Sequence, residues 1–324
     1  MKKVLVTGAA GFIGSHLSEL FVRKGIHVKA FIRYNSKNSW GWLEESSLKD
    51  EMEIVAGDIR DYDMVHAAMK GTDAVFHLAA LIGIPYSYVS PLAYIRTNIE
   101  GSYNVLQAAK DHALDLVIMT STSETYGTGQ YIPIDENHPM VGQSPYSATK
   151  IAADQIALSY FRSFDLPVKI VRPFNTYGPR QSARAIIPTV ITQILDGQKE
   201  IRLGNISPTR DLTYVTDTVE GFLEISKSAD LFGEITNIGS GREISVENLV
   251  RLISELMQTE IDIQSDQERV RPGKSEVERL LCDNSKIMKF TQWSPRIELR
   301  AGLLETIEWL KGHQDLYKSE LYNV

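Results

Sequence analysis

The sequence predicts an α/β fold in which a doubly wound parallel sheet is followed by a smaller, mixed C-terminal domain. Three observations support this fold class. Short apolar runs alternate with helical periodicity over the first half of the chain, as in parallel sheets buried on both faces. A glycine-rich turn joins the first apolar run to the first helix. Beyond Phe174 the alternation weakens, which predicts domains over residues 1–173 and 174–324, with some later segments returning to the first sheet.

Composition narrows the class of protein. The 324 residues have room for two domains of roughly 150 residues each, and 43% hydrophobic with 23% charged residues is ordinary for a soluble globular protein. A net charge of -7 argues against a general nucleic-acid binder. The single cysteine, Cys282, leaves no disulfide framework or thiol-based metal site and favours a cytoplasmic location. No apolar stretch approaches the roughly 18 residues of a membrane span, and the seven histidines form no metal-binding pattern.

The first predicted strand, residues 3–7, runs into a turn with glycines at positions 8, 11 and 14, and a helix follows over residues 15–24. A strand, a glycine turn and a helix in this order predict a dinucleotide-binding (Rossmann) site. Gly8 would allow the tight turn, Gly11 would let a pyrophosphate approach the helix N-terminus, and Gly14 would let helix and strand pack closely. The alternative is a glycine turn that binds nothing.

The second strand, residues 27–32, ends where such folds select their cofactor. An acidic residue at this point bonds the ribose 2′-hydroxyl of NAD, whereas a basic one accepts the 2′-phosphate of NADP. The chain offers Arg33, Asn35 and Ser36, with no carboxylate until Glu44. We therefore predict NADP, while NAD stays possible if Arg33 stacks on the adenine.

The remaining elements follow in order. Asp58 comes after the third strand and could bond the adenine amine, and the small residues Ala79 and Ala80 end the fourth strand, where they would let the chain pass close to the cofactor. We predict strands over residues 53–56, 74–80, 116–120 and 167–172, with short strands near 201 and 235. We predict helices over residues 61–69, 91–112, 147–164, 185–195, 216–227, 246–258 and 301–311.

Tyr146 and Lys150 lie four residues apart, on one face of the helix that follows the fifth strand. A nearby ammonium favours the phenolate form of tyrosine, so Tyr146 could take a proton from a secondary alcohol while hydride leaves its carbon. Ser121 or Thr122 would bond the same alcohol. A tyrosine and a lysine at this spacing also arise by chance in many helices, and the position after a glycine-fingerprinted sheet favours the catalytic interpretation.

The chain resembles the extended short-chain dehydrogenase/reductase family over nearly its whole length. The resemblance is carried by TGAAGFIG, GDI at 57–59, HLAA at 77–80, STSETYG at 121–127, YSATK at 146–150, RPFNTYGPR at 172–180, TRDLTYVTD at 209–217 and RPG at 271–273. It implies an NAD(P)-dependent enzyme acting on a nucleoside-diphosphate sugar, and a homodimer. The cofactor-binding residues it implies are Gly8, Gly11, Phe12, Ile13, Gly14, Arg33, Asn35, Ser36, Asp58, Ile59, Leu78, Ala79, Ala80, Tyr146 and Lys150. The substrate-binding residues are Asn175, Arg180, Arg210 and Arg271, each of which could instead be an ordinary structural residue.

Glu124 narrows the implied reaction. The run Thr122-Ser123-Glu124 is similar to the Thr-Ser-Glu of sugar-nucleotide 4,6-dehydratases such as the GDP-mannose dehydratases. The longer run from SETYG to GPRQSARAIIP most resembles the legionaminic-acid type, which acts on nucleotide-linked N-acetylglucosamine. In that reaction Tyr146 and Lys150 promote oxidation at C4, Glu124 removes the C5 proton as water leaves C6, and hydride returns to C6. Ser123 stands where relatives have aspartate, so Glu124 is expected to protonate the departing hydroxyl.

Several alternatives stay open. Glu124 could merely cap a turn. UDP-glucuronate decarboxylases of this family also show a Ser-Glu-Val-Tyr-Gly-like run, but they carry an arginine shortly before the tyrosine, where this chain has Gln143-Ser144-Pro145. The 4-epimerases usually have a small or apolar residue in place of Glu124. A non-catalytic dinucleotide sensor would commonly lack the Tyr146 and Lys150 pair.

Overall fold

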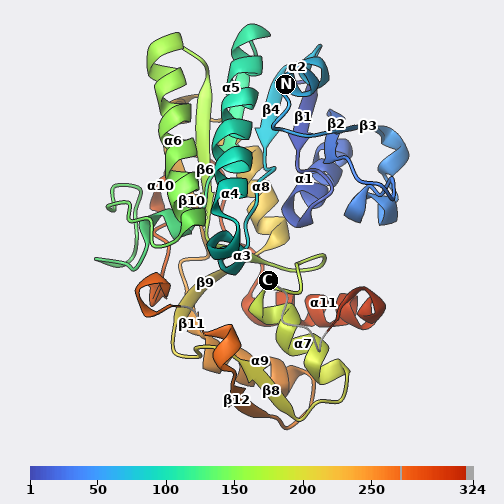
Figure 1. Cartoon of the computed structure of the whole chain (residues 1–324), viewed down its shortest axis with the longest axis vertical. Coiled ribbons are helices and arrows are strands. Elements are labelled where there is room, and N and C mark those ends of the chain that lie inside the picture. Colours follow the sequence, from blue (N-terminus) through green and yellow to red (C-terminus); the bar gives the residue numbers. More distant parts are fainter. Residues whose placement is uncertain (271, 319–324) are drawn as a thin grey trace.

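The computed structural model describes residues 1–270 and 272–318, which form a larger lobe built on a sheet and a smaller lobe below it (Figure 1). The large sheet has seven strands in the order β10-β6-β5-β4-β1-β2-β3, and all neighbouring strands are parallel. The predicted doubly wound parallel sheet is therefore confirmed. Its strands are β1 (Lys3–Thr7), β2 (His27–Arg33), β3 (Met52–Gly57), β4 (Ala74–His77), β5 (Leu116–Thr120), β6 (Val168–Pro173) and β10 (Ile235–Ile238).

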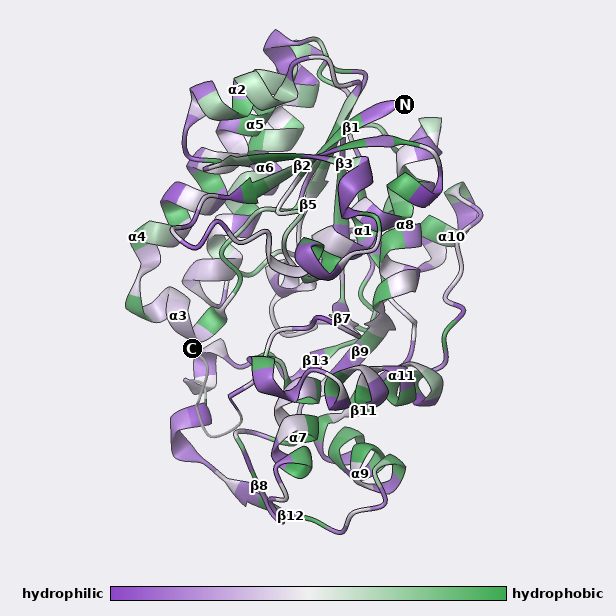
Figure 2. Ribbon diagram, turned by 90° about the vertical axis from the view of Figure 1, so that its right-hand side faces the viewer, coloured by the Kyte–Doolittle hydropathy of each residue, from purple (hydrophilic) through white to green (hydrophobic). Residues whose placement is uncertain are grey.

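Helices cover both faces of this sheet (Figure 2). Alternate residues of β1 show the two layers, because Val4 and Val6 join one hydrophobic cluster while Leu5 joins the other, all fully buried. Each such side chain contributes about 1.5–3 kcal/mol by leaving water. One face carries α1 (Phe12–Arg23), α8 (Val215–Lys227) and α10 (Ser285–Phe290), and the other carries α2 (Tyr62–Met69), α5 (Gly101–Asp111) and α6 (Pro145–Phe164).

The strand order reverses between β1 and β4. Strand β1 pairs in parallel with β4, where Thr7 lies opposite His77, and with β2, where Thr7 lies opposite Phe31. Helices that follow neighbouring strands leave the sheet towards opposite faces at such a point, so a crevice opens beyond the carboxyl ends of the strands. The glycine turn after β1, Asp58 after β3 and the segment after β5 all lie at this edge.

The single helix predicted over residues 91–112 is wrong in one respect. The structure has α4 (Pro91–Tyr94), a π-helical segment (Ile95–Glu100) and then α5. The buried side chain of Asn98 lies in the π-helical segment and bonds both backbone groups of Leu81, at 2.8 and 2.9 Å, and the Thr149 hydroxyl at 3.0 Å. The wider turn thus ties the loop after β4 to α6.

The smaller lobe is built around β9 (Thr209–Tyr214), which pairs with β7 (Asn175–Tyr177), β11 (Glu243–Ser245) and β13 (Arg279–Leu280). A separate pair joins β8 (Glu200–Leu203) to β12 (Asp262–Ser265). Strand β10, although late in the chain, belongs to the large sheet beside β6. The remaining helices are α3 (Ile84–Val89), α7 (Ile186–Leu195), α9 (Val246–Leu256) and α11 (Leu299–Lys311).

No helix among residues 1–270 and 272–318 has both the length and the apolar character needed to cross a membrane. Within the same residues, no three His, Cys, Asp or Glu side chains converge as a metal site would require.

Candidate functional site

The glycine turn has the geometry that a dinucleotide site needs. Gly8 has a φ of 73°, and a Cβ there would lie 2.8 Å from the Ala79 backbone nitrogen. A Cβ on Gly14 would lie 2.2 Å from the Gly8 carbonyl oxygen, so only glycine fits at either position. Gly11 caps α1, whose first turn presents the N–H groups of Phe12 and Ile13 without intrahelical partners. Such a helix N-terminus suits a pyrophosphate.

The three residues predicted to select the cofactor differ in whether their side chains are free to bind it. Arg33 and Ser36 are exposed beyond β2. The Asn35 amide is used inside the loop, because it donates to the Ser39 carbonyl at 2.8 Å and accepts from the Lys37 and Ser39 N–H groups. Asn35 therefore shapes the loop rather than offering a free donor. Of the three predicted phosphate partners, Arg33 and Ser36 are left.

Asp58 stands beyond β3 beside Arg60, which donates from Nε to both carboxylate oxygens at 2.9 and 3.1 Å. This pairing holds the pKa of Asp58 below its usual value, so the group is an ionised acceptor. The next residue, Ile59, is buried, and a Cβ on Gly101 of α5 would lie 2.7 Å from its Cδ1. Asp58 thus lies at the carboxyl edge, where an adenine amine could reach it.

Tyr146 and Lys150 are brought together at the N-terminus of α6. The helix begins at Pro145, where Ser144 and Ser147 form a reciprocal capping box. Tyr146 is 7% exposed and Lys150 5%, and the Lys150 ammonium donates to the Thr120 carbonyl at 2.5 Å. Burial lowers the pKa of Lys150. The pair lies where β5 ends, as the sequence predicted.

The surroundings of the Tyr146 hydroxyl shift its pKa in opposite directions. Burial raises its pKa above the usual value, a hydrogen bond with Thr122 lowers it, and the negative charge of Glu124 raises it. A positive charge bound beside the ring would favour the phenolate. These interactions place Thr122, Glu124 and Tyr146 in one cluster.

The structure separates Ser121 from Thr122. Ser121 is buried, and its hydroxyl donates to the Asp154 carboxylate at 2.6 Å. Thr122 is the residue that contacts the Tyr146 hydroxyl, and its Oγ1 also accepts from the Glu124 N–H at 3.3 Å. Of the two hydroxyls considered for the substrate alcohol, Thr122 is therefore the one in position.

Glu124 lies in the short 3-10 turn Ser123–Tyr126, whose cap is Thr122 rather than Glu124 itself. Its side chain is half-buried, and no hydrogen bond or ion pair with another described residue occupies the carboxylate. The neighbouring Ser123 is buried. A carboxylate placed beside a tyrosine hydroxyl and left unpaired is available for proton transfer, which argues against a mere capping role.

A chain of buried hydrogen bonds behind the glycine turn was missed by sequence reasoning. The Ser102 hydroxyl donates to the Asn98 carbonyl at 2.6 Å, so it accepts from His77 at Nε2 and leaves Nδ1 of the neutral ring as an acceptor. The Thr7 hydroxyl therefore donates to His77 Nδ1 at 2.8 Å, and its oxygen accepts from the Ala79 N–H at 3.2 Å. The His77 Nε2–H then donates to Ser102, at 3.1 Å. Burial lowers the pKa of His77 to about 3, so the ring is neutral. Thr7 and His77 are 70 residues apart, and no local pattern could pair them.

The residues predicted to bind the substrate lie in different parts of the structure and do not form one cluster. Asn175 begins β7, and its Oδ1 is buried without a hydrogen-bond partner among the described residues. Arg180 faces α1, where it donates to Glu19 at 2.8 Å and Ser15 at 3.1 Å. Arg210 lies in β9 and pairs with Glu276 at 3.3 Å. Arg271 lies outside the described residues.

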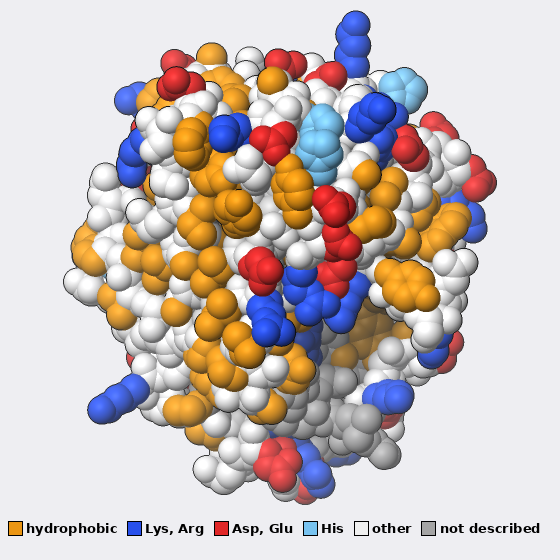
Figure 3. All heavy atoms as spheres, turned by 45° about the horizontal axis from the view of Figure 1, so that its top comes forward, with side chains coloured by type: hydrophobic (Ala, Val, Ile, Leu, Met, Phe, Trp, Pro, Cys, Tyr) orange, Lys and Arg blue, Asp and Glu red, His pale blue; other side chains and the backbone are white. Residues whose placement is uncertain are grey.

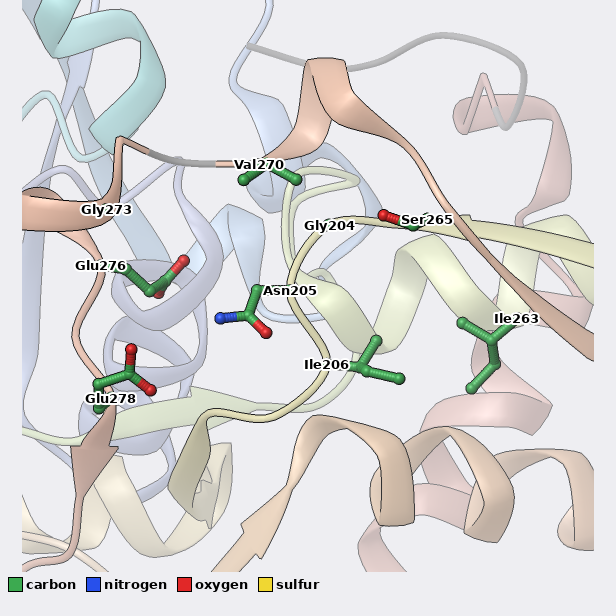
Figure 4. A pocket seen from close by; sticks show the side chains of 9 residues that line it. All are labelled: Gly204, Asn205, Ile206, Ile263, Ser265, Val270, Gly273, Glu276 and Glu278. Atoms are coloured by element: carbon green, nitrogen blue, oxygen red, sulfur yellow. The ribbon is translucent and has the colours of Figure 1, made fainter.

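A pocket of about 440 Å³ opens beside Arg210's partner Glu276, between the loop after β8 and the segment before β13 (Figure 4). Its wall is tied to the catalytic segment, because the Ser275 hydroxyl donates to the Gln143 carbonyl at 2.7 Å and Tyr88 contacts Ser275 at 2.6 Å. The pocket is lined by Gly204, Asn205, Ile206, Ile263, Ser265, Val270, Gly273, Glu276 and Glu278.

Comparison with known proteins gives a consistent family. The profile described as GDP-mannose 4,6 dehydratase matches residues 5–306. A dTDP-glucose 4,6-dehydratase from Streptomyces antibioticus is 32% identical over 96% of this chain and 93% of its own. A UDP-N-acetyl-alpha-D-glucosaminuronate decarboxylase from Bacillus cytotoxicus is 34% identical over 96% of this chain and 98% of its own.

Solved structures agree with the fold. A dTDP-glucose 4,6-dehydratase from Streptomyces venezuelae, solved with NAD bound, superposes with a TM-score of 0.86 at 28% identity, covering 98% of this chain and 99% of that one. A UDP-glucuronic acid 4-epimerase from Bacillus cereus, in complex with UDP-glucuronic acid and NAD, gives 0.87 at 27% identity, covering 97% of this chain and all of that one. Dehydratases, decarboxylases and epimerases thus share this architecture.

Proposed function

The chain belongs to the GDP-mannose 4,6-dehydratase family of extended short-chain dehydrogenases/reductases, and from this membership we propose that it is a nucleotide-sugar 4,6-dehydratase. One observation carries the choice of reaction. Among the described residues the Glu124 carboxylate has no hydrogen-bond or ion-pair partner, and its charge acts on the Tyr146 hydroxyl, so a second acid/base group is available near the one that serves oxidation. Epimerisation at C4 needs only the first of these groups.

The residues divide the work as follows. Thr122 bonds the C4 hydroxyl of the sugar and Tyr146 takes its proton, with Lys150 stabilising the phenolate electrostatically. The glycine turn and the free N–H groups at the start of α1 would hold the dinucleotide, which would supply hydride-transfer chemistry when bound. The resulting 4-ketone acidifies the C5 proton, which Glu124 removes, and Glu124 protonates the C6 hydroxyl as water departs. C6 would then take back the hydride that C4 gave up, and C5 would take a proton equivalent to the one that Tyr146 removed from the C4 hydroxyl, so that the sugar loses one water with no net redox change.

A second candidate is a reaction on a nucleotide-linked uronate, by decarboxylation or epimerisation. The position of Arg184 favours it. A Cβ on Gly83 would lie 2.6 Å from the exposed Arg184 guanidinium, so the two residues are close neighbours. The Gly83 carbonyl accepts from the Tyr94 hydroxyl, and the Tyr94 ring packs against the Tyr146 ring. A guanidinium at this place could hold a carboxylate. Against this candidate, epimerisation needs no second acid/base group such as Glu124, and the run Gln143-Ser144-Pro145 before Tyr146 holds no arginine of the kind that the decarboxylases carry.

The identifying experiment separates these reactions by mass. We expect the purified protein, supplied with NAD, to convert one nucleotide-linked hexose or N-acetylhexosamine into a product lighter by one water, detected by mass spectrometry. We propose an N-acetylglucosamine nucleotide as that substrate, because the run from Glu124 to Pro188 resembles the legionaminic-acid type. Loss of carbon dioxide from UDP-glucuronate, or an isomer of unchanged mass, would refute the dehydratase assignment.

The cofactor can be tested at Arg33. The solved relatives hold NAD, and the sequence-based preference for NADP now rests on Arg33 and Ser36 because Asn35 is engaged. We propose that both dinucleotides bind and that Arg33 holds the 2′-phosphate. A charge-assisted hydrogen bond contributes about 1.5–3 kcal/mol, so Arg33→Ala should weaken NADP binding about tenfold or more and leave NAD binding within about threefold. Fluorescence titration of both cofactors measures this.

The control for Arg33 is Lys37→Ala, which removes an exposed cation from the same loop. It should change the affinities for NAD and NADP by similar small factors. If Arg33→Ala and Lys37→Ala weakened NADP binding equally, the assignment of the 2′-phosphate to Arg33 would be wrong.

We also propose a homodimer that buries the outer faces of α5 and α6. Hydrophobic side chains gather on one face of the molecule (Figure 3). Tyr103 of α5, Phe164 of α6 and Ile95 before α5 are each 45–49% exposed. A contiguous apolar surface of this kind marks an interaction site. A monomeric mass by light scattering at micromolar concentration would reject the dimer.

A further inference from the structure

Helix α11 of the smaller lobe and the residues after it carry aromatic side chains that reach the larger lobe. The Trp309 ring lies edge-on to the Trp42 ring, with 5.3 Å between the ring centres and 72° between the ring planes. The His313 ring stacks on Trp309 at 4.1 Å and places its Nε2 3.3 Å from the Glu45 carboxylate. Tyr317 packs edge-on against Trp309 at 6.2 Å. We call Trp42, Trp309, His313 and Tyr317, all half-buried, the aromatic bridge.

In the larger lobe, the bridge contacts the glycine turn through the short 3-10 helix Gly41–Glu45. The Trp42 N–H donates to the Ala10 carbonyl, inside the turn, at 3.1 Å. Gly41 has a φ of 58°, and a Cβ there would lie 2.6 Å from the same carbonyl oxygen. Only glycine therefore lets this 3-10 helix lie so close to the turn. The segment that presents the Trp42 ring to α11 is thus fixed to the backbone of the dinucleotide site.

A second connection leads from the bridge to α1. The Tyr317 hydroxyl donates to the Gln181 carbonyl at 2.8 Å, and the preceding residue, Arg180, donates to Glu19 of α1 at 2.8 Å. Burial raises the pKa of Glu19, but hydrogen bonds with Arg180 and with Ser46 outweigh it and hold the pKa below its usual value. Ser46 directly follows the 3-10 helix, so both connections meet at Glu19, in the helix whose N-terminus faces the dinucleotide site.

Within the smaller lobe, α11 is fixed to the strands that carry the predicted substrate residues. Glu305 accepts from the hydroxyl of Tyr214, the last residue of β9, at 2.6 Å. A Cβ on Gly302 would lie 2.3 Å from the Oη of Tyr177, the last residue of β7. Because α11 packs this closely on both strand ends, it can move only together with β7 and β9.

We propose that Trp309 is a positioning residue for the dinucleotide, acting through Trp42 to hold the glycine turn in its binding geometry. The proposal rests on the proposed function for the presence of a dinucleotide, but not on the reaction. A turn that is already ordered binds more tightly, because the ligand does not have to order it. Since Trp309 moves with the strands of the smaller lobe, that lobe sets how firmly the larger lobe holds its cofactor.

The test is a double-mutant cycle read by NAD binding to the full chain, using isothermal titration calorimetry, so it does not depend on turnover. Trp42→Leu and Trp309→Leu should each weaken NAD binding about five- to tenfold, since an edge-to-face aromatic pair contributes up to about tenfold in an equilibrium constant. The double variant should bind NAD within about twofold of the single variants, because either substitution alone breaks the contact. Tyr317→Phe, which removes only the hydroxyl that bonds Gln181, should weaken NAD binding about threefold.

The control is Trp293→Phe, which changes a tryptophan outside the bridge. Trp293 is buried, and its Nε1 donates to the Asp217 carbonyl at 2.8 Å. Losing this hydrogen bond should lower the thermal midpoint but leave the affinity for NAD within about twofold of the parent chain. The control therefore separates a positioning effect from a general loss of stability.

The outcomes separate this inference from the proposed function. An affinity for NAD in Trp309→Leu within about twofold of the parent chain, or single effects that multiply in the double variant, would overturn the positioning role, even if the parent chain dehydrated a sugar nucleotide. Non-additive weakening by the two leucine variants would support it, even if every sugar nucleotide failed to lose water and the dehydratase assignment fell. A parent chain that bound no NAD would refute both.

Discussion

Glu124→Gln should abolish the loss of water while leaving oxidation of the substrate at C4 measurable. Glutamine keeps the size and shape of glutamate but cannot take the C5 proton, and general acid–base catalysis contributes about 10²–10⁴-fold to such a step. The Tyr146, Lys150 and Thr122 groups that serve oxidation remain in place. The variant should therefore stop at the 4-ketone with the reduced cofactor bound.

The measurement is a single-turnover reaction followed by absorbance of the reduced nicotinamide and by mass spectrometry of the sugar nucleotide. The matched comparison is Tyr146→Phe, which lacks the hydroxyl that takes the C4 proton and should show neither reduced cofactor nor water loss. If Glu124→Gln formed product at a rate within a few-fold of the parent chain, the acid/base role of Glu124 would be lost, and with it the main argument for dehydration.

The parts of the site that were predictable from sequence are those whose members lie close together along the chain. Gly8, Gly11 and Gly14 belong to one turn, and Tyr146 and Lys150 to one helical face, so spacing alone indicates their geometry. The parallel sheet was predictable for the same reason, since each apolar run is local. Pairing between the runs follows from the general rules of such folds rather than from particular residues.

The unpredicted parts depend on contacts between distant segments. Asn98 holds Leu81 and Thr149 and coincides with a π-helical break inside what reads as one helix. The hydrogen bond between Thr7 and His77 fixes a neutral histidine that sequence alone leaves as an ordinary core residue. Arg180 matches a substrate-binding motif, yet its guanidinium is engaged by Glu19. Each result requires knowing which side chain faces which, and a single sequence carries no periodic signal for that.

A buried ion pair beneath the catalytic turn leads to the largest expected change in stability. Arg172 of β6 is fully buried, and its Nη2 donates to the Asp154 carboxylate at 2.6 Å, while its guanidinium lies 4.5 Å from the centre of the Tyr126 ring. The same carboxylate accepts from Ser121. One side chain of α6 thus joins the ends of β5 and β6, directly before Thr122.

Asp154→Ala should lower the free energy of unfolding by about 3–5 kcal/mol, because it leaves the Arg172 guanidinium buried without a counter-charge. At roughly 2–4 °C per kcal/mol, the thermal midpoint should fall by on the order of 10 °C. Differential scanning calorimetry and urea unfolding measure both quantities. Glu247→Ala is the control, since it breaks the exposed pair with Arg251, which contributes at most about 1 kcal/mol.

The double variant Asp154→Leu with Arg172→Met tests the cause of this loss. Replacing both charges by apolar side chains removes the unpaired buried charge, so much of the stability lost in Asp154→Ala should return. Activity should not return with it, because Ser121 still lacks its acceptor and the turn that carries Thr122 and Glu124 loses its anchor. A single Asp154→Ala variant no less stable than Glu247→Ala would show that Arg172 finds another partner, and the ion pair would then have no structural role beneath the site.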